Sequence, residues 1–382
     1  MRRRKPAAVF FALALSLGAL ISCSNRPDSW TGRIEVEDGI RVIHNTNKAL
    51  ASSDAITLAS ELIIGQETDG QGEALFRNLL PYGCVDTDAS GRIFVLDSGA
   101  DAVLRFDSQG EFEKSFGRRG QGPGEFQSAG CLRVMPDGGI MVVDGIGPKL
   151  VLFDADGTFV REDRIAGSLE IAVPAIDSLG GIVVTSTEFG ERWTWRLVRV
   201  SPGLKDTITL AETATRRLFD GSTIDLYTPQ FRFAVTAGDE IVWGFQNEYA
   251  LSVAGLDGRV LRKIRKDFDP VPVTEAEFQA RLKDTFGGRG APQNVTLVRP
   301  ASYWPFLLLV GDEDGRIMAR TPEKSADGKM RYDLFGKDGR FAATIGIDGF
   351  PVLWKGGRLF VLEESPETGQ VLRRMKIELK GI

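Results

Sequence analysis

Aromatic and arginine side chains beside the longer predicted loops are the clearest candidates for chemistry in this sequence. Six such residues lie there: Arg118, Arg119, Trp193, Trp195, Tyr303 and Trp304. Flat rings can stack on sugars or peptide groups, and guanidinium groups donate hydrogen bonds, so together these residues could bind a glycan or a peptide. The competing interpretation is that the tryptophans pack in the interior.

Histidine and the acidic residues limit the reactions that this chain can perform. His44 is the only histidine, which excludes a zinc site built from several histidines, and a Ser-His-Asp triad would need His44 itself. Acidic residues are plentiful, but Asp97 and Asp144 end equivalent predicted strands, where capping of backbone N–H groups explains them. No cofactor is predicted, although a calcium site stays open because oxygen ligands leave no compact spacing.

An internal repeat indicates the scaffold that must position these side chains. An apolar half-strand, a tight turn and a four-residue apolar run recur six times, with the turns at Gly91, Gly138, Gly180, Asp239, Gly315 and Gly357. The units that begin near Cys84 and Cys131 each contain four short predicted strands. Such repetition is typical of a radial β architecture. We therefore expect an all-β fold over residues 33–382, a six-bladed β-propeller of four-stranded antiparallel blades.

The ring also needs a closing strand. A propeller whose last blade lacks a strand would leave an open edge. The C-terminal unit supplies only three strands, so residues 57–64 are predicted to complete blade six as its outer strand. The segment 34–45 also alternates, and we interpret it as an added edge strand.

The predicted turns divide the propeller into two faces. Tight Asp/Gly turns fall on one face, the turn face, and segments of variable length fall on the other, the long-loop face, where function tends to collect. Within the insertion at 266–305, a capping box is predicted at Thr274, and Phe278, Leu282 and Phe286 follow at helical spacing. We expect a helix there, either as a lid at the channel mouth or packed on the rim.

The two cysteines of the blades, Cys84 and Cys131, occupy equivalent positions in neighbouring units. A rotation relates these positions, so the two side chains should run parallel, which suits a disulfide poorly. We expect buried free thiols.

The start of the chain has the pattern of an export signal. Residues 1–22 combine a basic start with an apolar run, and Cys23 follows at once. The stretch resembles a bacterial lipoprotein signal, which implies a lipid on Cys23 and, with Ser24 next to it, an outer-membrane location; an ordinary signal peptide is the alternative. Residues 23–32 would be a tether to a domain that faces the periplasm or the cell surface. Residues 1–22 carry four positive charges and no negative ones, so the net charge of −5 becomes −9 without them, which argues against nucleic acid as a partner.

Residues 117–126 and the strands after them resemble the start of an NHL repeat, and the mature chain resembles bacterial six-bladed β-propeller lipoproteins of the TolB-like group. The resemblance implies a shape but no reaction, because members of this group share little chemistry. The leading hypothesis is a monomeric, membrane-anchored, non-catalytic binding module for a protein, peptide or glycan. Two alternatives stay open: a metal-dependent hydrolase or lactonase that uses channel carboxylates, and a structural subunit of an envelope complex.

Overall fold

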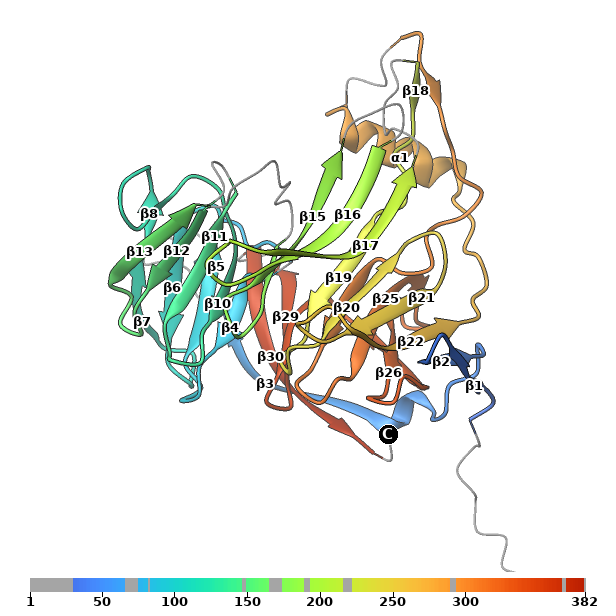
Figure 1. Cartoon of the computed structure of the whole chain (residues 1–382), viewed down its shortest axis with the longest axis horizontal. Helices are drawn as coiled ribbons and strands as arrows, with labels where there is room; N and C mark the ends of the chain where they lie inside the picture. Colours follow the sequence, from blue (N-terminus) through green and yellow to red (C-terminus); the bar gives the residue numbers. More distant parts are fainter. Residues whose placement is uncertain are drawn as a thin grey trace, which may run out of the picture.

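In the described part of the chain, six sheets of four or more strands surround a central cavity, and two short two-stranded pairs stand beside them (Figure 1). The computed structural model describes residues 30–65, 75–81, 83–145, 149–164, 174–188, 193–215, 222–288, 293–365 and 369–380. The inner strand of each sheet lines a central cavity. The fold is therefore the predicted all-β, six-bladed propeller with four antiparallel strands in each blade. The predicted signal peptide and Cys23 lie outside the described residues.

The first three blades follow the chain in order, each from its inner to its outer strand. Blade one consists of β4 (Val85–Thr87), β5 (Ile93–Asp97), β6 (Ala102–Phe106) and β7 (Phe112–Phe116). Blade two consists of β10 (Ala129–Val134), β11 (Ile140–Asp144), β12 (Lys149–Phe153) and β13 (Phe159–Arg164). Blade three consists of β14 (Ala175–Ile176), β15 (Ile182–Glu188), β16 (Trp193–Val200) and β17 (Thr207–Thr215).

Of the remaining blades, four and six also include strands from the N-terminal segment in their sheets. Blade four consists of β19 (Phe231–Val235), β20 (Ile241–Phe245), β21 (Ala250–Ala254) and β22 (Val260–Lys266). Blade five consists of β24 (Leu308–Gly311), β25 (Ile317–Lys324), β26 (Met330–Phe335) and β27 (Phe341–Ile347). Blade six consists of β28 (Phe350–Lys355), β29 (Arg358–Ser365), β30 (Gly369–Leu379) and, as its outer strand, β3 (Ile56–Ile64).

The turn between the first two strands of every blade contains a residue with positive φ, at the six positions that the repeat marks. Five of these residues are glycines, which adopt this conformation without a Cβ clash. The sixth is Asp239, with a φ of 62°. Its carboxylate accepts hydrogen bonds from the backbone N–H of Ser178, at 2.9 Å, and from the hydroxyl of the same residue. The turn of blade four is thus held against the turn of blade three.

Apolar side chains fill the six spaces between neighbouring blades, with one cluster in each space. Each cluster contains at least one large side chain. In ring order, beginning with the space between blades six and one, these side chains are Phe360, Phe94, Met141, Trp243, Phe335 and Trp354. Full burial of such a side chain stabilises the fold by roughly 1.5–3 kcal/mol. Because every cluster needs two blades, the core is complete only in a closed ring.

The N-terminal segment 33–64, which we call the strap, runs along the outer edges of three blades. Its hairpin of β1 (Arg33–Glu37) and β2 (Ile40–Asn45) joins blade four, where β2 pairs in parallel with β22. After this hairpin, Leu50 and Ala51 donate backbone hydrogen bonds to β27 of blade five, at 3.0 and 2.8 Å. The strap then forms η1 (Ser53–Ala55) and β3, which pairs with β30. The predictions of a closing strand at 57–64 and of an edge strand at 34–45 are both confirmed.

Asn45 fixes the strap where it passes from blade four to blade five. Its side chain is buried, and its amide donates hydrogen bonds to the carbonyl oxygens of Arg265, at 3.2 Å, and Gly339, at 3.0 Å. Its amide oxygen accepts hydrogen bonds from the indole of Trp30, at 2.9 Å, and the backbone N–H of Phe341, at 2.7 Å. All four hydrogen-bonding positions of the amide are therefore used.

Two further predictions about the first blades are confirmed. Asp97 accepts hydrogen bonds from two backbone N–H groups of the linker that enters blade one, and Asp144 does the same for blade two. Cys84 and Cys131 are buried free thiols. Burial raises the pKa of the Cys84 thiol to about 12, so this group is protonated at neutral pH.

The predicted insertion carries α1 (Glu275–Thr285), with the predicted capping box at Thr274. Phe278 and Leu282 of this helix are buried in a cluster with Tyr227 and Val273. The cluster stands on the long-loop face, beside a short parallel pair of β18 (Thr223–Ile224) and β23 (Thr296–Leu297) (Figure 1). In the described part of the chain, no helix has the length and apolar character needed to cross a bilayer.

Candidate functional site

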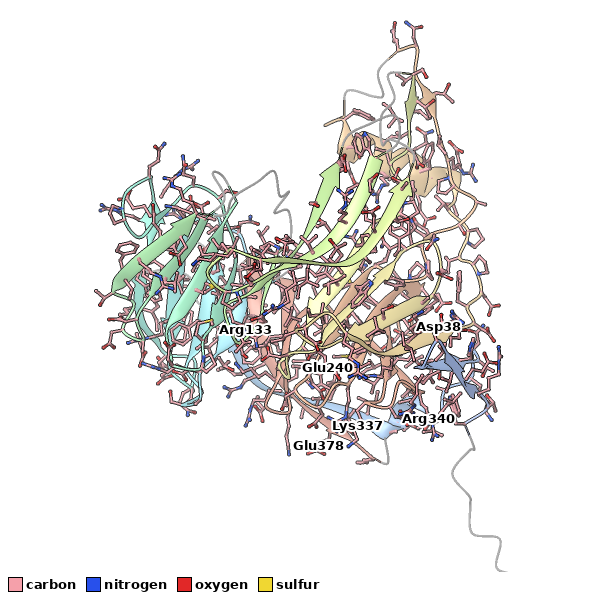
Figure 2. The ribbon with its side chains drawn as sticks, viewed as in Figure 1. Asp38, Arg133, Glu240, Lys337, Arg340 and Glu378 are labelled. Atoms are coloured by element: carbon pink, nitrogen blue, oxygen red, sulfur yellow. The ribbon has the colours of Figure 1, made fainter. Side chains whose placement is uncertain are left out.

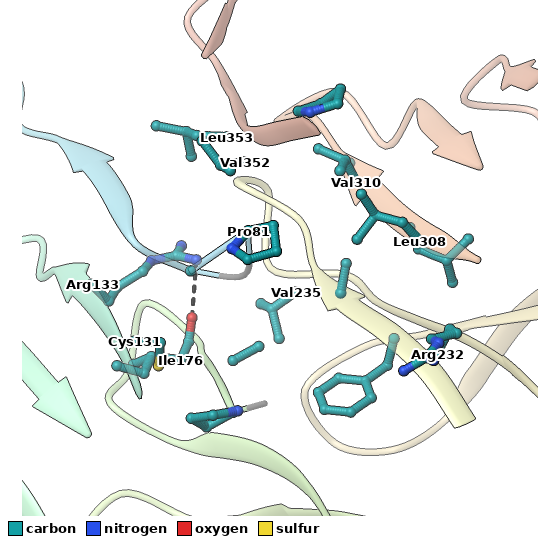
Figure 3. Close-up of a pocket in the computed structure, with 18 of the residues that line it drawn as sticks. Pro81, Cys131, Arg133, Ile176, Arg232, Val235, Leu308, Val310, Val352 and Leu353 are labelled. Atoms are coloured by element: carbon teal, nitrogen blue, oxygen red, sulfur yellow. Dashed lines mark hydrogen bonds between the residues drawn. The ribbon is translucent and has the colours of Figure 1, made fainter. Parts of the chain in front are cut away.

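The main candidate site is a cavity of about 380 Å³ on the propeller axis (Figure 3). It extends from Pro81, Pro174 and Gln230, where linkers enter the inner strands, to Arg133 and Lys355 near the turn face. All six inner strands contribute to its wall. Its volume lies in the range of small-molecule sites, which is about 300–1,000 Å³.

Apolar side chains make up most of this wall. Leu308, Val310, Val352 and Leu353 approach from blades five and six, and Ile176 faces them from blade three (Figure 3). Among the described residues, four charged side chains also line the cavity: Asp86, Arg133, Arg232 and Lys355. Such a wall suits an apolar ligand that is oriented by a few polar groups.

A network of charged groups connects the blades at the turn-face end of the cavity. Lys355 of blade six donates a hydrogen bond to the buried carboxylate of Asp86 in blade one, at 2.7 Å. The other oxygen of Asp86 accepts from the backbone N–H of Val134 in blade two, at 2.9 Å. Arg133 reaches across to Asp239 of blade four, with Nη2 and Oδ1 3.5 Å apart. The polar groups at this end are thus bound to one another.

Arg118 and Arg119 lie far from the axis, in the linker between blades one and two. They form β8 (Arg118–Arg119), which pairs with β9 (Glu125–Phe126), and their side chains are 80% and 82% exposed. Arg118 pairs with Glu125, with Nε and Oε1 2.7 Å apart. In Figure 1, β8 and α1 stand on opposite sides of the molecule.

Trp193 and Trp195 lie on β16 of blade three, with their ring centres 6.5 Å apart. Trp195 packs against the cluster between blades three and four and also lines the central cavity. Its indole N–H donates to the hydroxyl of Thr215, at 3.1 Å. Trp195 therefore serves both the core and the cavity wall.

Tyr303 and Trp304 pack under α1, in the cluster around Tyr227. The Trp304 indole donates to the carbonyl oxygen of Tyr227, at 3.0 Å, and the guanidinium carbon of Arg281 lies 4.6 Å from the centre of the Tyr227 ring. Both residues also line a second pocket, between blades four and five. No α1 residue lines the central cavity, and Phe278 and Leu282 of the helix pack into the cluster around Tyr227.

The structure therefore separates the six candidate residues. Trp195 lines the central cavity, Tyr303 and Trp304 line the second pocket, and Arg118, Arg119 and Trp193 line neither. The charged residues of the inner strands that line the cavity, such as Asp86 and Arg133, were not among the residues predicted from the sequence. The sequence signal that could have identified them is a charged residue inside an otherwise apolar inner strand.

Calcium ligands are not gathered in the described part of the cavity wall. Calcium takes six to eight oxygen ligands. Asp86 is the one acidic residue of that wall, and its oxygens are bound to Lys355 and Val134. In the described chain, one group has acidic and histidine atoms close enough to share an ion, Glu35, Glu37 and His44 on the strap. There, Arg33 and Arg265 already hold the two carboxylates.

Comparisons with known proteins agree on the fold. A family model described as a six-bladed β-propeller matches residues 86–175. A putative exported protein from Bacteroides fragilis superposes with a TM-score of 0.55 at 12% identity, over 88% of this chain and 99% of its own. A member of the DUF4221 family from Bacteroides vulgatus has a TM-score of 0.52 at 12% identity, over 86% and 99%. These similarities establish the fold alone. No curated protein matches the sequence.

Proposed function

We propose that this chain is a lipid-anchored, non-catalytic binding module of the cell envelope, which takes an apolar part of a protein or peptide ligand into its central cavity. The wall of that cavity carries the proposal, because apolar side chains from all six blades form most of it. The charged groups near the turn face are already bound to one another, so they orient a ligand better than they transfer protons. A glycan suits this wall less, since sugars need many hydrogen-bonding partners.

The proposed anchor is a lipid on Cys23, which would hold the domain at the outer membrane with its propeller in the periplasm or at the cell surface. Trp30, the first described residue, packs against Arg340, with its ring centre 4.7 Å from the guanidinium carbon. The seven residues from Cys23 to Trp30 span at most about 25 Å. The edge of the propeller around Arg340 would therefore stay close to the bilayer.

One observation favours the second candidate, a structural subunit of an envelope complex. β1 is the outer edge of its sheet, and its side chains Ile34 and Val36 are 40% and 68% exposed. An exposed apolar edge strand can pair with a strand of another chain. This role would use the strap rather than the central cavity.

Replacing Cys23 with serine is expected to release the protein from the membrane. Acyl chains provide the proposed attachment, and without them the folded domain has no anchor. Fractionation of the envelope should move the variant from the membrane pellet to the soluble fraction, while its circular dichroism spectrum stays that of the wild type. A variant that still carries labelled palmitate and sediments with the membrane would contradict the proposed anchor.

Filling the central cavity is expected to abolish ligand capture. Ala175→Phe adds a ring to the cavity wall, and Ala89→Phe adds the same ring to an exposed turn of blade one. The apolar dye 1-anilinonaphthalene-8-sulfonate should bind the wild type and Ala89→Phe alike, whereas Ala175→Phe should weaken its binding at least about tenfold, or 1.4 kcal/mol.

The same pair of variants tests capture in the cell. A photoreactive p-benzoylphenylalanine at position 352, in the cavity wall, should form a crosslinked adduct in intact cells, and adding Ala175→Phe should remove that adduct. The photoreactive group at position 89 is the control for surface collisions. Equal crosslinking at positions 352 and 89 would show that the cavity is not the binding site.

A further inference from the structure

The second pocket lies between blades four and five, on the long-loop side, and has a volume of about 180 Å³. We call it the side pocket. It is too small for a peptide, given that small-molecule sites occupy about 300–1,000 Å³, but it is large enough for one side chain. Strand ends of both blades form it, and Asn47 of the strap closes one wall.

A buried ion pair forms the floor of the side pocket. The side chains of Lys266 and Asp333 are 4% and 0% exposed, and Nζ lies 3.3 Å from Oδ2. The ammonium group also donates to the Asn47 side-chain oxygen, at 3.2 Å, and to the Asp267 carbonyl, at 3.1 Å. The Tyr249 hydroxyl donates to the same Asp333 oxygen, at 2.9 Å. Two hydrogen bonds and one ion pair therefore hold the Lys266 ammonium group in place.

The second carboxylate oxygen of Asp333 is different, because it is buried and accepts no hydrogen bond. The nearest cation is the Arg331 guanidinium, whose Nη2 lies 3.6 Å away, too far for a hydrogen bond. Arg331 is instead held by Glu323, with Nη1 and Oε2 2.6 Å apart. A buried carboxylate oxygen without a donor is costly, and an absent ligand or water is a usual explanation.

The charges of the side pocket favour a cation. Three acidic residues line it, Asp269, Glu323 and Asp333, against two basic ones, Lys266 and Arg331. Aromatic rings complete the lining, contributed by Phe268, Tyr249, Tyr303 and Trp304. Burial and the nearby Glu277 carboxylate raise the pKa of Tyr303 to about 12, so this phenol stays neutral. Carboxylates and aromatic faces together are a known environment for ammonium groups.

We propose that the side pocket binds a primary ammonium group, that of a lysine side chain in the captured peptide. The peptide part of this inference rests on the proposed function, whereas the recognition of an ammonium group does not. A metal ion fits the pocket less well. Among the described residues, the acidic groups of the side pocket are not close enough together to share an ion.

The test uses the full-length protein in detergent and isothermal titration calorimetry with Nα-acetyl-lysine amide. We expect saturable binding, and no binding of Nα-acetyl-norleucine amide, which keeps the carbon chain but lacks the charge. Glu323→Gln should weaken binding about tenfold. Glu378→Gln is the matched control, because Glu378 also pairs with a cation, Lys376 at 2.6 Å, but on blade six (Figure 2). Asp333→Asn should weaken binding most. If this substitution at a buried position prevents folding, Glu323→Gln still tests the inference.

Several results would overturn the inference. Equal affinity for the norleucine amide, unchanged affinity in Glu323→Gln, or competition by calcium chloride at matched ionic strength would each rule out an ammonium site. A peptide Ala-Lys-Ala should bind at least about tenfold more tightly than the single amide, and equal affinity would refute the peptide and leave a free amine as the ligand. Ala175→Phe should not change binding of the amide, so failure of the central cavity proposal can be told apart from failure of this one.

Discussion

Deletion of the strap, residues 33–64, is expected to unfold the propeller rather than trim its edge. β3 is the outer strand of blade six, and its loss would expose the hydrogen-bonding edge of β30. Ile56 and Ile64 at its ends belong to the apolar clusters on the two sides of blade six. The deletion therefore opens two of the six interfaces between blades at once. Circular dichroism should show no cooperative melting transition near that of the wild type, and size-exclusion chromatography should show aggregates.

A smaller deletion provides the control for this result. Replacing only residues 33–43 with a Gly/Ser linker removes the hairpin on blade four but keeps Asn45 and β3. This variant is expected to remain monomeric and to melt cooperatively at a lower temperature, because the ring is still closed. If the strap deletion itself were monomeric with an unchanged melting temperature, the assignment of β3 as the closing strand would be wrong.

The blades were predictable because their determinants are local. Each unit encodes its own tight turn, and the residues at those turns have positive φ in the structure, even where Asp239 replaces glycine. The capping box at Thr274 is equally local. The closing strand could also be found, because the six-fold repeat left one blade with three strands.

The path of the strap could not be predicted in the same way. β2 pairs in parallel with β22, where Asn45 meets Lys266, and nothing within either segment specifies the other as its partner. In the sequence, Asn45 is only a polar residue at the end of a short predicted strand. Its role comes from four hydrogen bonds. Three of them join Asn45 to groups that are distant in the sequence, and the fourth joins it to the nearby Trp30.

Candidate site residues were harder still to predict, because the sequence does not show whether an aromatic ring packs in the interior or binds a ligand. Trp304 illustrates this, since it packs under α1 and also lines the side pocket. Arg118 was selected as an arginine beside a long predicted loop, but it lies on a distant linker. The inner strands carried the better signal, since a charge such as Arg133 among apolar neighbours has to meet a partner near the axis.

A second large loss of stability is expected from Asp86→Ala, at the junction of blades six and one. This substitution leaves the backbone N–H of Val134 without its acceptor and removes the ion-pair partner of Lys355, whose ammonium group still donates to the carbonyl oxygen of Thr87. Loss of one partner from a buried ion pair costs about 3–5 kcal/mol, and Lys355 is 31% exposed, so we expect a loss near 3 kcal/mol in the free energy of unfolding. Urea denaturation followed by tryptophan fluorescence measures this change.

A double-mutant cycle separates the ion pair from the loss of the side chain itself. Lys355→Met should destabilise the protein on its own, because it strands the buried carboxylate, and the two changes together should cost less than the sum of the single changes. The matched control is Asp327→Ala, since Asp327 also pairs with a lysine at 2.8 Å, but at an exposed turn within blade five. That pair should contribute little to stability, because water and salt screen an exposed ion pair. Equal losses at the exposed turn and at the junction would mean that the network at the turn-face end of the cavity does not hold the ring together.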